Sequence, residues 1–136
     1  MKLIIGNIGS GKTKKALELG IKLAASGKKV LFFDGEASAD HYIKNILQNK
    51  NLPVGFSVFD RIQKAEDVYA KIEFGGYDAY IIDTPKLFFG LEKLNSLKPA
   101  NSIYLVLGLE NNVQPDLNNN MVIITSYEEM KSLFSK

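Results

Sequence analysis

Short apolar runs alternate with helical patterns along this chain of 136 residues. Strands that alternate with helices pair mainly in parallel, because each helix returns the chain to the end of the sheet at which the next strand begins. The runs predict six strands, which are expected at residues 3–5, 30–33, 56–59, 80–82, 103–107 and 121–125. A continuous apolar run such as Tyr80 to Ile82 is typical of a strand that is buried on both faces. We therefore expect an α/β fold in three layers, with a mainly parallel sheet of about six strands.

Helical periodicity fills most of the intervals between these runs. Helices are expected at residues 12–26, 39–48, 64–74 and 85–94. The first has an apolar stripe along one side and is expected to end at Gly27. Ser126 and Glu129 have the spacing of a capping box for a final short helix. Residues 108–120 include five asparagines, a proline and an aspartate, and this composition predicts a loop.

Length and composition limit the class of protein. The chain fits a single domain over residues 1–136, because domains cluster around ~100 to 150 residues and no linker interrupts this one. An apolar content of 46% with a net charge of +2 excludes a disordered or strongly charged chain. The absence of cysteine excludes disulfides and thiolate zinc sites, and the single histidine, His41, weighs against Ser/His/Asp catalysis. No apolar run approaches the ~20 residues that span a bilayer. We expect a cytoplasmic protein without a membrane partner.

The strongest motif has the pattern G-x-x-x-x-G-K-[ST], directly after the first expected strand and directly before the first expected helix. It consists of Gly6, Asn7, Ile8, Gly9, Ser10, Gly11, Lys12 and Thr13. Glycines allow backbone N–H groups to close around phosphates, and a helix N-terminus favours the negative charge. Lys12 is expected to reach the β- and γ-phosphates, and Thr13 to ligate Mg²⁺. The motif therefore predicts a site for ATP and magnesium.

Two further strands are expected to bring carboxylates to the same site. The run from Tyr80 to Ile82 ends in Asp83, the form of a Walker B strand whose aspartate holds Mg²⁺ through water. The second strand is followed by Asp34 and Glu36. The carboxyl ends of parallel strands meet at the ligand-binding edge of a sheet. Glu36 is therefore a candidate general base for the attacking water.

The phosphate loop, the helix after it and the segments VLFFDGEAS and YDAYIIDTP resemble the ATPase core of RecA-type recombinases and DnaB-type helicases, over about residues 1 to 84. The intervals from Lys12 to Glu36, 24 residues, and from Glu36 to Asp83, 47 residues, are close to those of RecA-type proteins. The resemblance implies that Glu36 activates water and that Asp40 and Tyr42 contact adenine. It also implies a spatial strand order of 3-2-4-5-1-6 and a role accessory to DNA recombination, repair or replication.

The second half of the chain departs from that family. The stretch from Asp83 to the fifth strand is much shorter than in recombinases, and no polar sensor is evident in Leu107-Gly108-Leu109. We therefore expect a minimal or accessory RecA-like ATPase.

Three alternatives remain open. The segments GKKVLFFDGE and YDAYIIDTP also resemble partition ATPases of the ParA and MinD type, whose signature lysine is replaced here by Asn7. A nucleoside or nucleotide kinase is a second alternative, although such enzymes usually use several arginines and this chain has only Arg61. The third is a degenerate nucleotide-binding scaffold without activity.

Partners other than ATP are indicated less directly. Single-stranded DNA is one candidate, through Lys86, Lys93, Lys98 and the loop at residues 108–120, although +2 is a weak basic footprint. ATPases of this type also complete their site with a basic residue from a neighbouring subunit. Arg61, Lys86 or Lys98 could serve in that role, which would require self-association or a protein partner.

Overall fold

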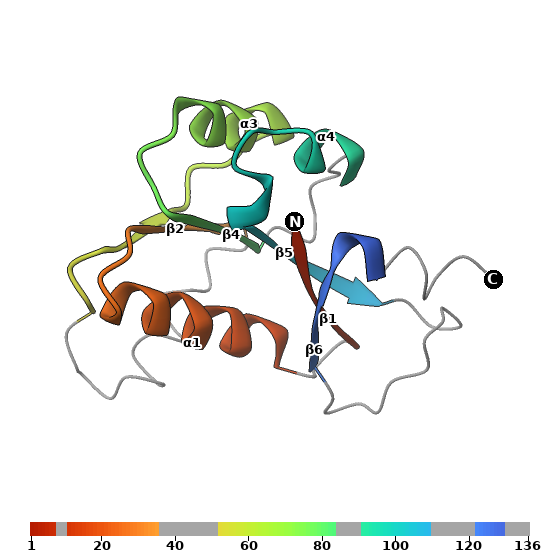
Figure 1. Ribbon diagram of the computed structural model, residues 1–136, viewed down its shortest axis with the longest axis horizontal. Helices are drawn as coiled ribbons and strands as arrows, with labels where there is room; N and C mark the ends of the chain where they lie inside the picture. The colour runs from red at the N-terminus through yellow and green to blue at the C-terminus, as the bar shows by residue number, and fades with distance from the viewer. Residues whose placement is uncertain (8–10, 36–51, 84–90, 110–121, 130–136) are drawn as a thin grey trace.

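The computed structural model describes residues 1–7, 11–35, 52–83, 91–109 and 122–129. Over these ranges the chain forms an α/β fold around one six-stranded sheet (Figure 1). The strands are β1 (Lys2–Asn7), β2 (Val30–Asp34), β3 (Phe56–Phe59), β4 (Ala79–Asp83), β5 (Ile103–Leu109) and β6 (Val122–Ser126). The helices are α1 (Lys12–Ala25), α3 (Ala65–Phe74) and α4 (Leu91–Asn95), with a 3-10 turn at Ala100–Ser102.

The sheet has the order β3-β2-β4-β5-β1-β6. All neighbouring strands are parallel except β1 and β6, which are antiparallel. The prediction of a mainly parallel six-stranded sheet is thus confirmed. The observed strand order is the same as the order 3-2-4-5-1-6 that the resemblance to RecA-type proteins implies. In this arrangement β5 separates β1 from β4, so the strand before the predicted phosphate loop and the strand ending at Asp83 are not neighbours.

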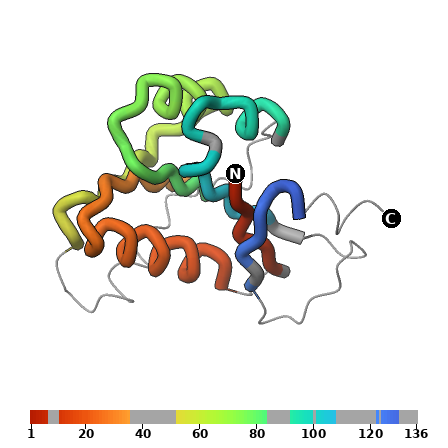
Figure 2. Tube along the Cα trace, in the orientation of Figure 1, coloured from red at the N-terminus to blue at the C-terminus, as the bar shows by residue number. Residues whose placement is uncertain are grey.

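Helices cover both faces of the sheet. In Figures 1 and 2, α1 lies below the sheet, and α3 and α4 lie above it. Successive side chains of a strand point to opposite faces. Phe32 and Ile81 accordingly belong to the apolar cluster that contains the buried residues of α1, whereas Phe33 and Ile82 belong to the cluster with α3 and α4. All five residues of β4 are buried, as its apolar run predicts.

Most predicted boundaries lie within one or two residues of the observed ones. The strand at 56–59 is confirmed in full, and the helix expected at 64–74 begins at Ala65. The helix expected at 39–48 lies outside the described residues, as does most of the one expected at 85–94. The expected loop at 108–120 is wrong at its start, because Gly108 and Leu109 continue β5 by pairing with β1. The rest of that loop lies outside the described residues.

The capping box expected after β6 forms in part. Residues 127–129 are helical, and the Glu129 N–H donates to Ser126 Oγ at 3.1 Å. The Glu129 carboxylate, however, accepts a hydrogen bond from Thr125 Oγ1 at 2.9 Å. Thr125 is a buried residue of β6. This hydrogen bond therefore joins the turn to the strand before it.

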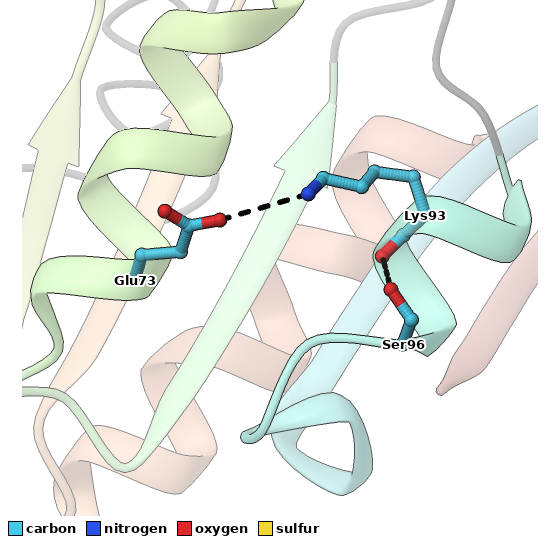
Figure 3. Close-up of polar contacts among 3 residues, drawn as sticks. All are labelled: Glu73, Lys93 and Ser96. Carbon is cyan, nitrogen blue, oxygen red and sulfur yellow. Dashed lines mark hydrogen bonds and ion pairs between the residues drawn. The ribbon is translucent and has the colours of Figure 1, made fainter.

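The helices α3 and α4 are joined by a surface ion pair (Figure 3). Lys93 Nζ lies 3.8 Å from Glu73 Oε1, and both side chains are more than half exposed. An exposed pair of this kind stabilises a fold by at most about 1 kcal/mol. Ser96 Oγ donates to the Lys93 carbonyl at 2.7 Å and closes the end of α4.

None of the helices in the described ranges is long and apolar enough to cross a membrane.

Candidate functional site

The turn from β1 into α1 carries the predicted phosphate loop. Gly6 is buried in β1, where it pairs with Gly108 of β5, and Asn7 is the last residue of the strand. Gly11 precedes α1 with a φ of 92°, in the left-handed region that favours glycine. The remaining loop residues, Ile8, Gly9 and Ser10, lie outside the described part of the chain. The described residues thus place both ends of the loop at the carboxyl end of β1.

The N-terminus of α1 is suited to an anion. Its first turn contains no acidic residue, and no side chain among the described residues caps it. It contains Lys12, Lys14 and Lys15 instead. Three cations at the positive end of a helix dipole oppose helix formation, by roughly 0.3–1 kcal/mol each. A bound phosphate would offset this repulsion and accept hydrogen bonds from the first N–H groups of the helix.

A hydrogen bond joins this helix to the end of β4. Thr13 Oγ1 donates to Asp83 Oδ2 at 2.7 Å, although the two residues are 70 positions apart. Asp83 is only 2% exposed. A hydroxyl that donates a hydrogen bond keeps its oxygen lone pairs as acceptors. The Thr13 oxygen can therefore ligate a cation while its O–H group stays hydrogen-bonded to Asp83.

Asp34 lies beside Asp83 in the neighbouring strand. The parallel register of β2 and β4 pairs these two residues, and the Gly35 N–H donates to the Asp83 carbonyl at 2.9 Å. Asp34 is 4% exposed. The sequence indicated that this strand brings both Asp34 and Glu36 to the site, but it suggested a role only for Glu36. The signal for Asp34 is the alternation along β2, in which Val30, Phe32 and Asp34 occupy one face.

Several predicted site residues cannot be placed. Glu36, the predicted base, lies outside the described residues, as do Asp40 and Tyr42, the predicted adenine contacts. Lys86 also lies outside them. Of the other basic candidates, Arg61 and Lys98 are exposed.

The partners of Lys93 lie in the neighbouring helix α3. Its ammonium group pairs with Glu73 and lies 5.8 Å from the centre of the Tyr69 ring. These contacts are those of a solvated helix face, and they do not bring Lys93 to the carboxyl edge of the sheet where Thr13 and Asp83 meet.

The oxygen atoms at this site are better suited to a magnesium ion that is also bound to a nucleotide than to a metal ion held by the protein alone. The described residues contain no group of three or more His, Cys, Asp or Glu that could hold a metal. Magnesium is usually held by one or two carboxylates together with substrate phosphates and water, and it prefers oxygen ligands. Thr13 and Asp83 supply such oxygens next to the N-terminus of α1. These residues are therefore those that would hold Mg²⁺ bound to a phosphate chain.

No protein-family model matches this sequence, and no curated protein matches it at a significant level. Any functional assignment therefore depends on the site itself.

Proposed function

We propose that this protein is a RecA-like P-loop ATPase with three layers, which binds Mg-ATP at the Gly6 to Thr13 loop and hydrolyses it. The observation that carries the proposal is the hydrogen bond of 2.7 Å between Thr13 and Asp83. It joins the last residue of a phosphate-loop motif to the carboxylate of an apolar strand, the two groups that bind magnesium in P-loop proteins.

Each residue has a separate role in this proposal. The loop backbone and the N-terminus of α1 bind the phosphates, and Lys12 neutralises charge on the β- and γ-phosphates. Thr13 and Asp83 hold Mg²⁺, which when bound polarises the phosphoryl oxygens. Glu36 accepts a proton from the attacking water. Asp40 and Tyr42 contact the adenine.

The strand order supports the RecA-like assignment. The order β3-β2-β4-β5-β1-β6 is the one that this resemblance implies. It puts β2, which leads to Glu36, directly beside β4 and Asp83. The proposal includes a role in DNA recombination, repair or replication, and only the resemblance to RecA-type proteins supports that role.

Calorimetry with a non-hydrolysable ATP analogue tests nucleotide binding. The wild type should bind the analogue with magnesium, and Lys12→Ala should lose about 10- to 100-fold in affinity, as expected for a charge-assisted contact. Lys22→Ala is the matched control, because Lys22 is an exposed lysine in the last turn of the same helix. If the analogue produces neither a heat of binding nor a change in the thermal midpoint of the wild type, the proposal is overturned and a degenerate scaffold is favoured.

Hydrolysis is tested separately through Glu36. Glu36→Gln keeps the size of the side chain and removes the carboxylate, so binding should persist while turnover falls by ~10² to 10⁴. Glu18→Gln, at an exposed position of α1, controls for the change in charge. Turnover at the wild-type rate in Glu36→Gln would remove Glu36 from the mechanism.

The remaining alternatives differ in what accelerates turnover. A site completed by a second subunit predicts a specific activity that rises with protein concentration, and a DNA-linked ATPase predicts stimulation by single-stranded DNA. A kinase instead predicts that a nucleoside or nucleotide acceptor increases ADP release and becomes phosphorylated.

A further inference from the structure

Asp34 is a buried carboxylate to which the proposed mechanism gives no role. It is the last residue of β2 and is 4% exposed, beside Asp83 at 2%. Burial of two neighbouring carboxylates is unfavourable unless a cation or hydrogen bonds compensate, because like charges in a poorly hydrated place repel. Among the described strand residues, which are mostly apolar where they are buried, this pair places two carboxylates side by side.

The two carboxylates share the face of the sheet that α1 covers. Val30 and Phe32 of β2 belong to the cluster with α1, so Asp34, two residues further on, lies on the same face. Ala79 and Ile81 place Asp83 there in the same way. The hydrogen bond from α1 to Asp83 agrees with this assignment.

The backbone holds the two carboxylates in register. Val30 to Asp34 pair with Ala79 to Asp83 without interruption. The hydrogen bond of 2.9 Å from the Gly35 N–H to the Asp83 carbonyl extends the pairing past both side chains. Neighbouring strands are ~4.8 Å apart, which sets the separation of the two Cα atoms.

This separation fits a contact through one water molecule. Magnesium binds its water at about 2.0–2.1 Å, and a carboxylate accepts a hydrogen bond from that water at ~2.7 Å. An outer carboxylate therefore lies roughly 4 Å from the ion. Asp34 ends β2, the strand next to β4 on the side away from β1. A cation beside Thr13 and Asp83 would thus lie next to the strand end that carries Asp34.

We propose that Asp34 is a positioning residue of the magnesium site, which accepts hydrogen bonds from the water ligands of the ion and so orients the hydrated metal together with Asp83. This inference rests on the proposed function, because it requires a magnesium-bound nucleotide at Thr13. It adds a second carboxylate to the site and predicts that magnesium affinity depends on β2 as well as on β4.

The test measures how strongly magnesium improves the binding of an ATP analogue to the full chain. Calorimetric titrations are made in excess magnesium and in chelator, for the wild type, Asp34→Asn and Asp60→Asn. Asp60 follows β3 at the same edge of the sheet but is exposed, so Asp60→Asn removes the same charge without touching the buried pair. Thermal unfolding without metal shows whether each variant is folded.

Asp34→Asn should lower the apparent affinity for magnesium by about 10- to 100-fold, the usual effect of losing an outer partner of a metal site. Its binding of the analogue in chelator should stay within about five-fold of the wild type, and Asp60→Asn should change either quantity by less than about five-fold. If Asp34 had only a structural role, Asp34→Asn would weaken binding of the ATP analogue equally with and without magnesium.

The proposal is overturned by an unchanged magnesium affinity in Asp34→Asn, by an equal loss in chelator, or by an equal effect of Asp60→Asn. A wild type that binds the analogue without any magnesium effect overturns both this inference and the metal-dependent part of the proposed function. If Asp34→Asn does not fold, Asp34→Glu replaces it. That variant moves the carboxylate by one methylene, and an unchanged magnesium affinity in it again overturns the proposal.

Discussion

The hydrogen bond between Thr13 and Asp83 connects a helix and a strand that the chain separates by 70 residues. It is short, and its acceptor is a buried carboxylate. A hydrogen bond to a charged group contributes about 1.5–3 kcal/mol. The bond therefore prepares the site before a ligand arrives, because it keeps the threonine oxygen beside the carboxylate.

A double-mutant cycle measures this contact. Thr13→Val and Asp83→Asn should show a coupling free energy of about 1–3 kcal/mol in urea unfolding without nucleotide, because each change alone already removes the charged hydrogen bond. Thr13→Ser keeps the hydroxyl and serves as the control. Strictly additive effects of the two substitutions would contradict the contact.

Gly20 allows α1 to lie close to the sheet. A Cβ atom built on Gly20 would lie 2.7 Å from Phe56 Cε2 and 3.0 Å from Ile81 Cδ1. Only the far ends of these two side chains stand in the way, and both are packed in the core. The approach of the helix to β3 and β4 therefore depends on the absence of a side chain at this position.

Gly20→Leu should consequently destabilise the fold by about 1–3 kcal/mol, the usual effect of overpacking a core. Gly20→Ala should be milder, because the gain of about 1 kcal/mol in helix propensity opposes the steric strain. Equilibrium unfolding in urea measures both. Glu18→Leu, at an exposed position of the same helix, is the control. Equal stability of Gly20→Leu and the wild type would show that the helix does not need this close approach.

The start of α3 is stabilised by Asp67. Its carboxylate accepts hydrogen bonds from the N–H groups of Gln63, at 2.8 Å, and Lys64, at 3.1 Å. The backbone hydrogen bond from Gln63 is the largest cause that lowers the pKa of Asp67 from its ordinary value of 3.8, followed by that from Lys64. The ionised carboxylate is thus favoured in the folded state.

This shift predicts a pH dependence of stability. A lowered folded-state pKa means that the stabilisation is complete above pH 3.8 and is lost as the pH falls through the lower folded value. Asp67→Asn should therefore be less stable than the wild type at pH 7, and the difference should shrink below pH 3.8. Glu66→Gln, in the same turn, is the control. A difference that does not change with pH would contradict this assignment.

The whole molecule brings the strands with site residues to one edge of a single sheet. β1 leads to the predicted phosphate loop, β2 ends at Asp34 and β4 ends at Asp83. All three run in the same direction. A ligand that bridges α1 and β4 would therefore hold together segments from both halves of the chain. Binding should then stabilise the fold as a unit.

Nucleotide binding should accordingly raise the thermal midpoint of unfolding. A Mg-ATP analogue at 100 times its dissociation constant adds about 2.7 kcal/mol, which corresponds to roughly 5–15 °C for a domain of this size. Lys12→Ala at the same analogue concentration should show a much smaller rise, and magnesium without nucleotide should have little effect. An equal rise in Lys12→Ala would place the ligand elsewhere.

The sequence predicted the local features of the fold well. Apolar runs located the strands because burial of a parallel strand on both faces requires continuous apolar residues. The strand from Phe56 to Phe59 was placed without error. The glycine pattern predicted a phosphate loop, and both described ends of the pattern lie where β1 ends and α1 begins, as that motif requires. The error at Gly108 and Leu109 arose because pairing with β1 outweighs the loop-like composition that follows.

By itself, then, the amino-acid sequence determined where the described strands and most of the described helices form, since these depend on short-range periodicity and turn chemistry. The strand order came from a resemblance and not from periodicity. Only the tertiary structure decided that Thr13 contacts Asp83 and that Asp34 lies in register with it. The physical reason is that the pairing of β2 with β4 depends on hydrogen bonds between segments far apart in the chain. A shift of one residue would turn one of these carboxylates to the other face.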